Sequence, residues 1–242
     1  MPLMLFDLDG TLVDSAPDLV ASMNRIRRAM ALEELPYETL REYAGAGARG
    51  LLWASFGLKP EDESFEKIKA DFLADYQAHC CDHVTIFQGI PSMLDALEAR
   101  GWQWGIVTNK FACFTDPLVE KAGFTGRAAA IISGDATAHL KPSPDNLFVA
   151  LETIGASAET CIYVGDDIRD AKAARAAGMD FIAVDWGYIR HDTPIQTWGA
   201  NYIAHQPSDI INLLPELIRR QGSMPHLPCR PEPQRPDGRL SR

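Results

Sequence analysis

The 242-residue sequence lacks the features that would indicate a membrane-spanning or exported protein. No apolar run approaches the roughly 18 residues that a helix needs to cross a bilayer. No basic stretch precedes the first apolar residues, and Asp7 and Asp9 follow them at once. We therefore expect neither a signal peptide nor a membrane partner.

Cysteine is also scarce and irregularly placed. The five cysteines are odd in number and contain no C-x-x-C pair, and the six histidines have no metal-ligand spacing. This pattern excludes a disulfide framework and a zinc site built on paired cysteines. It predicts a protein of a reducing compartment, the cytoplasm.

Basic residues are outnumbered, with 23 lysines and arginines against 33 acids and a formal net charge of −10. Such a balance argues against nucleic acid as a partner. A phosphate-bearing ligand would need a local cation to overcome the overall repulsion. The hydrophobic content of 46% is that of an ordinary globular protein with enough apolar material for a core.

Short apolar runs that do not alternate recur along the chain, as expected for strands buried on both faces of a parallel sheet. They are Leu3–Phe6, Trp104–Val107, Ala130–Ile132, Cys161–Val164 and Phe181–Val184. Helical patterns that mostly end at glycine separate them, at residues 91–100, 115–122, 144–154 and 169–177. This alternation predicts an α/β fold with a doubly wound parallel sheet.

Two stretches depart from the alternation. Residues 15–88 contain helical patterns and no convincing strand, which predicts a helical domain inserted into an α/β core formed by residues 1–14 and 89–221. Residues 222–242 hold five prolines and four arginines with little apolar content. That composition predicts a disordered tail, with a docking peptide as the alternative.

The first predicted strand ends in Asp7-Leu8-Asp9-Gly10-Thr11. Side chains two residues apart share one side of an extended backbone, and a glycine permits a sharp turn. One carboxylate can then attack an electrophile while the other moves a proton. The alternative is an ordinary turn in which an aspartate caps a helix.

Three further polar motifs follow predicted strands or begin predicted helices. Thr108 and Asn109 follow the strand at 104–107, where hydroxyl and backbone N–H groups can hold phosphate oxygens, or where they simply form a turn. Lys141 is followed by Pro142 and Pro144, which restrict the loop before the helix at 144–154. The lysine therefore offers a positioned charge for a phosphoryl group, or else is a solvated loop lysine.

The last motif is an acidic cluster after the strand at 161–164. Asp166, Asp167 and Asp170 provide hard oxygen ligands suited to Mg²⁺, although helix capping is the alternative. In open parallel sheets, ligands bind outside the carboxyl ends of the strands at a switch in strand order. We therefore expect all four motifs to meet in one crevice, around a metal and a phosphate.

These motifs resemble the four motifs of the haloacid dehalogenase superfamily. Asp7–Thr11 is similar to its D-x-D-G-T sequence, Thr108 to its second motif, Lys141 to its third, and Gly165–Asp170 to its acidic fourth. The similarity covers residues 3–186. It implies a Rossmann-like core, with the helical stretch at 15–88 as a C1 cap that opens and closes over the site.

Within the superfamily, the chain is similar to bacterial phosphoglycolate phosphatases through Asp7–Ser15, Val107–Lys110 and Val164–Asp170. It also resembles N-acetylmuramic acid 6-phosphate phosphatases, through Gly47-Ala48-Arg49, Gly187-Tyr188-Ile189 and Trp198-Gly199-Ala200. The resemblance therefore implies hydrolysis of a small phosphate ester. We expect 2-phosphoglycolate as the substrate, with the muramic sugar phosphate, or a phosphomutase activity, as alternatives.

The resemblance implies roles for the paired aspartates. Asp7 would attack phosphorus and form an aspartyl phosphate, and Asp9 would protonate the leaving alcohol and then activate water. Mg²⁺ would be held by Asp7, by the backbone carbonyl of Asp9 and by Asp166. A hydrolytic dehalogenase lacks the second aspartate, so Asp9 favours a phosphate ester, and it argues against a catalytically inactive phosphate-binding protein.

The resemblance also implies roles for the other motif residues in binding phosphate and in positioning the groups that bind it. Thr108, Asn109 and Lys141 would bind the phosphate oxygens, while Asp167 and Asp170 would position Lys141 or metal-bound water. In the insert, the glycine-rich stretch around Arg49 is the expected substrate loop, where the arginine would bind a substrate carboxylate or else face solvent. A monomer or homodimer is expected.

Overall fold

The structure is a computed structural model and describes residues 2–222. Apart from Gly222, the predicted tail lies outside the described residues. Within the described range, no helix combines the length and apolar character needed to cross a bilayer.

Six parallel strands form one sheet in the order β5-β4-β1-β6-β7-β8, so the predicted α/β class with a doubly wound parallel sheet is confirmed. The strands are β1 (Leu3–Phe6), β4 (Gln103–Val107), β5 (Ile131–Ile132), β6 (Cys161–Gly165), β7 (Asp180–Val184) and β8 (Tyr202–Ala204). The first five coincide with the predicted apolar runs. The edge strand β8 was not predicted, because three residues are too few for a recognisable pattern.

Successive side chains of the strands enter two separate apolar clusters. In β1, Met4 and Phe6 join one cluster, and Leu3 and Leu5 join the other. Helices α5 (Ile90–Glu98), α6 (Ala112–Lys121) and α9 (Pro207–Gly222) pack on the first face, and α7 (Asp145–Ile154) and α8 (Ile168–Ala177) on the second. All four side chains of β1 are fully buried, which explains why its sequence does not alternate.

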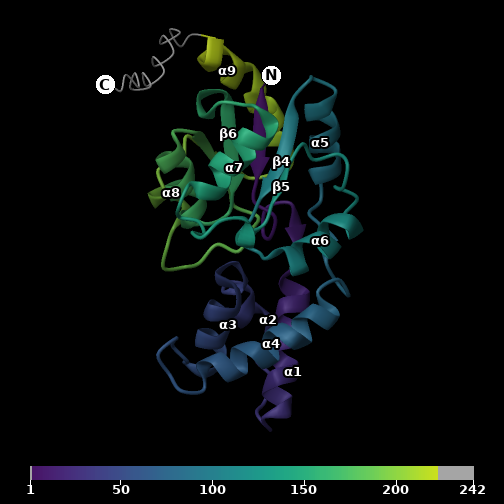
Figure 1. The fold of residues 1–242 in the computed structure, drawn as a ribbon, viewed down its shortest axis with the longest axis vertical. Coiled ribbons are helices and arrows are strands. Elements are labelled where there is room, and N and C mark those ends of the chain that lie inside the picture. The colour runs from purple at the N-terminus through teal and green to yellow at the C-terminus, as the bar shows by residue number, and fades with distance from the viewer. Residues whose placement is uncertain (1, 223–242) are drawn as a thin grey trace, which may run out of the picture.

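Four further helices occupy the stretch between β2 (Val13–Asp14) and β3 (Thr85–Ile86). They are α1 (Ala16–Ala29), α2 (Tyr37–Arg41), α3 (Gly47–Phe56) and α4 (Phe65–His79), and we call them the helical unit. Strands β2 and β3 pair antiparallel, so the chain leaves and returns side by side. Figure 1 shows the helical unit gathered as a separate body below the sheet.

The helical unit is seated on the α/β part by several polar contacts. The Arg41 guanidinium donates to the carbonyl oxygens of Gly187 at 3.0 Å and of Trp186 at 3.3 Å, and it lies 5.1 Å from the ring centre of Tyr188. Arg169 of α8 donates to the carbonyl oxygen of Gly45. These contacts hold the helical unit closed over the carboxyl ends of the strands.

Candidate active site

The site forms where the strand order reverses. Strand β1 lies between β4 and β6, and the chain adds β5 on one side and β7 and β8 on the other. The Asp7 amide donates to the Val164 carbonyl at 2.9 Å, which continues the pairing of β1 and β6 by one residue. Asp7 and Asp166 thus leave adjacent strands at the same edge, where α/β proteins bind ligands.

Asp7 is held by one of its two carboxylate oxygens. Its Oδ1 accepts from the Leu8 amide at 2.8 Å and forms an ion pair with Lys141 Nζ at 2.9 Å. Among the described residues, no hydrogen bond reaches Oδ2. That oxygen therefore remains available to a metal or an electrophile in the cavity.

Lys141 is buried in a fully polar environment. Its Nζ lies 2.9 Å from Asp7 and 2.8 Å from Asp170, and donates to the Tyr163 hydroxyl at 2.8 Å and the Val107 carbonyl at 3.1 Å. Burial opposes the charge, but the carboxylates of Asp170 and Asp7 outweigh it and raise the pKa of Lys141. The ammonium is therefore a permanent cation at the centre of the site.

Asn109 fixes the loop that carries this lysine. The Lys141 amide donates to Asn109 Oδ1 at 2.8 Å, and Asn109 Nδ2 donates back to the Lys141 carbonyl at 3.0 Å. The side chain of Asn109 thus holds the lysine loop in place, and the predicted contact of Asn109 with phosphate stays a prediction. Thr108 lies beside it with a buried side chain, and both residues line the cavity.

Carboxylate oxygens of Asp7, Asp166 and Asp170 lie within 4.8 Å of one another. Asp166 accepts from Thr11 Oγ1 at 3.0 Å and from the Tyr188 amide at 2.8 Å. Burial, reinforced by the charges of Asp7 and Asp170, raises the pKa of Asp166 well above its usual range. A divalent cation would relieve this repulsion, and an all-oxygen donor set fits Mg²⁺ better than zinc.

Asp170 serves both the acid cluster and the lysine. Burial raises its pKa to about 7, with Lys141 opposing the rise and Asp7 and Asp167 adding to it. Its Oδ2 also accepts from the Asp167 amide at 3.1 Å, as half of a capping box at the start of α8. The predicted capping alternative and the proposed positioning role therefore coexist in one side chain.

Asp167 is not one of the three clustered carboxylates, and it pairs with an arginine instead. Its carboxylate caps α8 through the Arg169 amide and pairs with the Arg169 guanidinium at 2.7 Å. Burial would raise its pKa, but the bonds to Arg169 dominate and lower it. Asp167 thus anchors Arg169, which in turn reaches the helical unit at Gly45.

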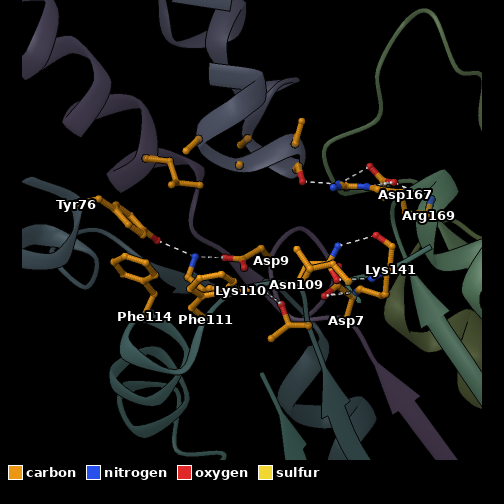
Figure 2. Close-up of a pocket in the computed structure, with 18 of the residues that line it drawn as sticks. Asp7, Asp9, Tyr76, Asn109, Lys110, Phe111, Phe114, Lys141, Asp167 and Arg169 are labelled. Atoms are coloured by element: carbon orange, nitrogen blue, oxygen red, sulfur yellow. Dashed lines mark hydrogen bonds and ion pairs between the residues drawn. The ribbon is translucent and has the colours of Figure 1, made fainter. Parts of the chain in front are cut away.

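Asp9 lies on the opposite side of the site from Lys141 (Figure 2). Its Oδ1 accepts from Ser15 Oγ and from Lys110 Nζ, the latter at 2.9 Å. Lys110 also donates to the hydroxyl of Tyr76 at 2.9 Å. Sequence reasoning did not select Lys110 or Tyr76; the only signal was the position of Lys110 directly after Thr108 and Asn109.

These residues surround a cavity of ≈ 400 Å³. Its floor is charged and comes from the strand ends. An apolar wall completes the lining, with Leu19, Phe72 and Leu73 from the helical unit and Phe111 and Phe114 from the α/β part, beside Lys110 (Figure 2). Among the described residues of the helical unit, Lys69 alone brings a charge to this lining, and its ammonium lies 3.2 Å from Glu66.

Arg49 is not brought into this cavity. Ala46, Gly47 and Ala48 line it, but the helix α3 begins at Gly47 and carries the next side chain away. Arg49 is exposed and lines a separate hollow with Trp53 and others. The glycine-rich spacing identified a loop at the cavity but could not indicate which side chain faces it.

The fold and the site define a class of enzyme: an α/β protein with paired aspartates after its first strand, and a lysine and acid cluster at the same sheet edge. Residues 4–184 match the model of the haloacid dehalogenase-like hydrolases, and the chain belongs to this family. The family predicted from the four motifs is thereby confirmed.

Relatives of known name are similar over most of their length. An N-acetylmuramic acid 6-phosphate phosphatase of Pseudomonas aeruginosa is 35% identical over 211 residues, 87% of this chain and 93% of the relative. A phosphoglycolate phosphatase of Xanthomonas campestris is 39% identical over 207 residues, 86% and 93% of the two chains. Both names support the predicted enzyme class, a phosphatase acting on a small phosphorylated metabolite.

A solved structure agrees with the fold. The crystal structure of a predicted phosphoglycolate phosphatase from Haemophilus somnus superimposes with a TM-score of 0.78 at 25% identity, and covers 88% of this chain and 98% of that one. The arrangement of strands and helices around the site is therefore shared with an experimental structure of a similarly sized protein.

Proposed function

We propose that this chain is a Mg²⁺-dependent phosphatase that cleaves a phosphomonoester through an aspartyl phosphate on Asp7. The supporting observation is that the two neighbouring carboxylates have different ion-pair partners. Asp7 pairs with Lys141 in the acid cluster, and Asp9 pairs with Lys110 on the other side of the cavity. Two neighbouring acids held apart by two lysines can act separately, one on phosphorus and one on a proton.

In the first step, a carboxylate oxygen of Asp7 forms a bond to phosphorus while the bond from phosphorus to the ester oxygen breaks. Asp9 transfers its proton to the departing oxygen, which leaves as an alcohol. In the second step, Asp9 takes a proton from water as the water oxygen attacks the phosphoryl group. Phosphate leaves, Asp7 is regenerated, and Asp9 is protonated again.

Lys141 and Thr108 stabilise the charge on the transferring group. The Lys141 ammonium is preorganised by four polar contacts and lies directly beside Asp7, where negative charge gathers on the phosphoryl oxygens. The helical unit, seated by Arg41 and Arg169, excludes bulk water from the cavity.

The metal would be held by Asp7, by Asp166 and by the backbone carbonyl of Asp9, with Asp170 at the edge of the group. When bound, Mg²⁺ offsets the repulsion between the carboxylates and a phosphate dianion. The three-carboxylate cluster supports this assignment, because ionised buried acids at such spacing are costly without a cation.

Two substrates follow from the names of the relatives, and the cavity favours the larger. A volume of ≈ 400 Å³ is in the range of sites that enclose drug-sized ligands, and far exceeds the needs of a two-carbon acid. The apolar wall also offers little to a carboxylate held close to the phosphate. The slightly higher identity to phosphoglycolate phosphatases keeps 2-phosphoglycolate as the second candidate.

Phosphate release with Mg²⁺ tests the proposal, using N-acetylmuramic acid 6-phosphate, 2-phosphoglycolate and hexose phosphates. We expect the muramic ester to have the highest kcat/KM, EDTA to stop turnover, and Asp7→Asn to abolish it while the protein stays folded. Failure of every ester to release phosphate would refute the phosphatase proposal, and conversion of a hexose phosphate into its isomer would indicate a mutase.

A further inference from the structure

A buried lysine connects the proton-transferring residue Asp9 to the helical unit. Lys110 Nζ lies 2.9 Å from Asp9 Oδ1 and 2.9 Å from the hydroxyl of Tyr76, which belongs to α4 (Figure 2). Only 9% of the lysine side chain is exposed. The chain Asp9–Lys110–Tyr76 thus spans the boundary between the strand ends and the helical unit.

Lys110 and Tyr76 are each held in place by further contacts. The Lys110 amide donates to Thr108 Oγ1 at 3.1 Å, and its carbonyl accepts from the Gly134 amide at 2.7 Å and from Thr115 Oγ1 at 3.1 Å. The ring of Tyr76 is buried and packs against Phe72 and Phe114. The lysine therefore meets Asp9 with a fixed geometry only when α4 is seated on the α/β part.

The bonds also select one oxygen of Asp9. Ser15 Oγ and Lys110 Nζ both donate to Oδ1, and no other described residue is hydrogen-bonded to Oδ2. Because Oδ1 already accepts two hydrogen bonds, Oδ2 is the oxygen left to exchange a proton with a substrate in the cavity, which Asp9 lines. Rotation of the carboxylate would exchange the two oxygens and withdraw the proton from the ester.

We propose that Lys110 and Tyr76 are positioning residues, which orient Asp9 for proton transfer only when the helical unit is closed over the substrate. This inference rests on the proposed phosphatase function and adds a link between closure and acid catalysis. A simple electrostatic or structural role predicts something different. A lysine that only attracted phosphate, or only supported the fold, would affect all esters alike.

Esters whose leaving groups differ in basicity can distinguish orientation of Asp9 from a purely electrostatic or structural role. An alkyl alcohol needs a proton as it departs, whereas 2,4-dinitrophenolate leaves without one. The parameter to measure is kcat/KM, because it reports only on the steps through departure of the alcohol and not on hydrolysis of the aspartyl phosphate. Lys110→Met and Tyr76→Phe are the variants, since methionine keeps the apolar length and phenylalanine keeps the ring.

For Lys110→Met, we expect kcat/KM to fall about 10- to 100-fold with the best alkyl phosphate of the panel, a part of the usual contribution of general acid catalysis. With 2,4-dinitrophenyl phosphate it should stay within about threefold of the unmodified enzyme. Tyr76→Phe should also lower kcat/KM for the alkyl phosphate and not for the dinitrophenyl phosphate, by a smaller factor. Because this variant loses only one hydroxyl, it tests the inference even where the methionine variant does not fold.

Lys67→Met is the matched control, because Lys67 lies on the outer side of α4, 79% exposed, and pairs with Asp71. It removes a lysine charge from the helix that carries Tyr76 and should leave both substrates unaffected. Equal losses on the alkyl and the dinitrophenyl ester in the Lys110 and Tyr76 variants would overturn the inference. An unmodified enzyme that hydrolyses neither ester would instead overturn the proposed function.

Discussion

Asn109 and Lys141 hold each other by a reciprocal pair of hydrogen bonds, amide to side chain at 2.8 Å and side chain to carbonyl at 3.0 Å. The two residues lie on different loops, one after β4 and one before α7. This pair fixes the backbone that carries the buried ammonium, whose Nζ lies 2.9 Å from Asp7 Oδ1. The side chain of Asn109 therefore positions the lysine that we propose as a phosphate-binding residue.

Asn109→Ala should lower kcat/KM about 10- to 100-fold, since displacement of a catalytic group by roughly an ångström has effects of this size. Asn201→Ala is a matched control, because Asn201 also makes two side-chain hydrogen bonds, to the Phe181 amide at 2.8 Å and to Asp180 at 2.9 Å, away from the cavity. Both variants should lose thermal stability, and only the first should lose activity. Equal activity in the two variants would contradict the positioning role.

Gly10 has a positive φ of +80°, and a Cβ there would lie 2.0 Å from Asp166 Oδ2. Gly10→Ala should therefore impose backbone strain of about 1–2 kcal/mol and also displace the Asp166 carboxylate, which we propose as a metal ligand. We expect an increase in the Mg²⁺ concentration required for half-maximal activity.

Gly155→Ala separates the two effects. Gly155 has a similar φ of +75°, but a Cβ there meets nothing within 4 Å. It should lower the free energy of unfolding by a similar strain term without changing the Mg²⁺ dependence. Activity titrations against Mg²⁺ combined with urea unfolding make the comparison, and an unchanged Mg²⁺ requirement in the Gly10 variant would show that Asp166 is not held at the metal.

Much of this site could be predicted from the sequence, because strands buried on both faces appear as uninterrupted apolar runs. The run Leu3–Phe6 is apolar at every position since both faces of β1 are covered, and its end locates Asp7 and Asp9. The order of motifs along the chain then predicts their meeting at one sheet edge. Only strand ends and local spacing are needed for this step.

The missed features depend on packing between distant segments. Tyr76 reaches Lys110 only because α4 folds back over the sheet edge, and one aromatic residue in an amphipathic helix gives no indication of that contact. Arg49 shows the converse. Its loop was identified, but a rotation of about 100° per helical residue decides whether a side chain faces the cavity, and spacing alone does not determine the starting point of the helix.

The metal-free protein should become less stable as pH rises. Asp170 has its pKa raised to about 7 by burial, from an ordinary value of 3.8, and Asp166 shifts in the same direction. A group that binds protons more tightly in the folded state contributes stability at low pH and loses it as pH rises through the folded pKa. For Asp170 this window runs from about pH 4 to about pH 7.

In the proposed site, Mg²⁺ should compete with these protons, because metal ions bind carboxylates in their ionised form. The increase in Tm on adding Mg²⁺ should therefore be small at pH 5 and larger at pH 8. Thermal unfolding with EDTA or with Mg²⁺ across this range measures the difference. A stabilisation by Mg²⁺ that is equal at both pH values would place the ion outside the acid cluster.

The position of Arg49 leads to a final prediction about substrate contact. Because Arg49 lines a hollow apart from the main cavity and is exposed, Arg49→Ala should change kcat/KM by less than about twofold, as surface substitutions away from a site usually do. Leu73→Trp gives the contrast, since Leu73 lines the apolar wall and a larger ring there fills part of the cavity. We expect it to lower kcat/KM for the muramic sugar phosphate about tenfold or more while sparing 2-phosphoglycolate, because overpacking excludes the bulkier leaving group. A marked loss in the Arg49 variant for carboxylate-bearing esters alone would show that the arginine reaches the substrate after all.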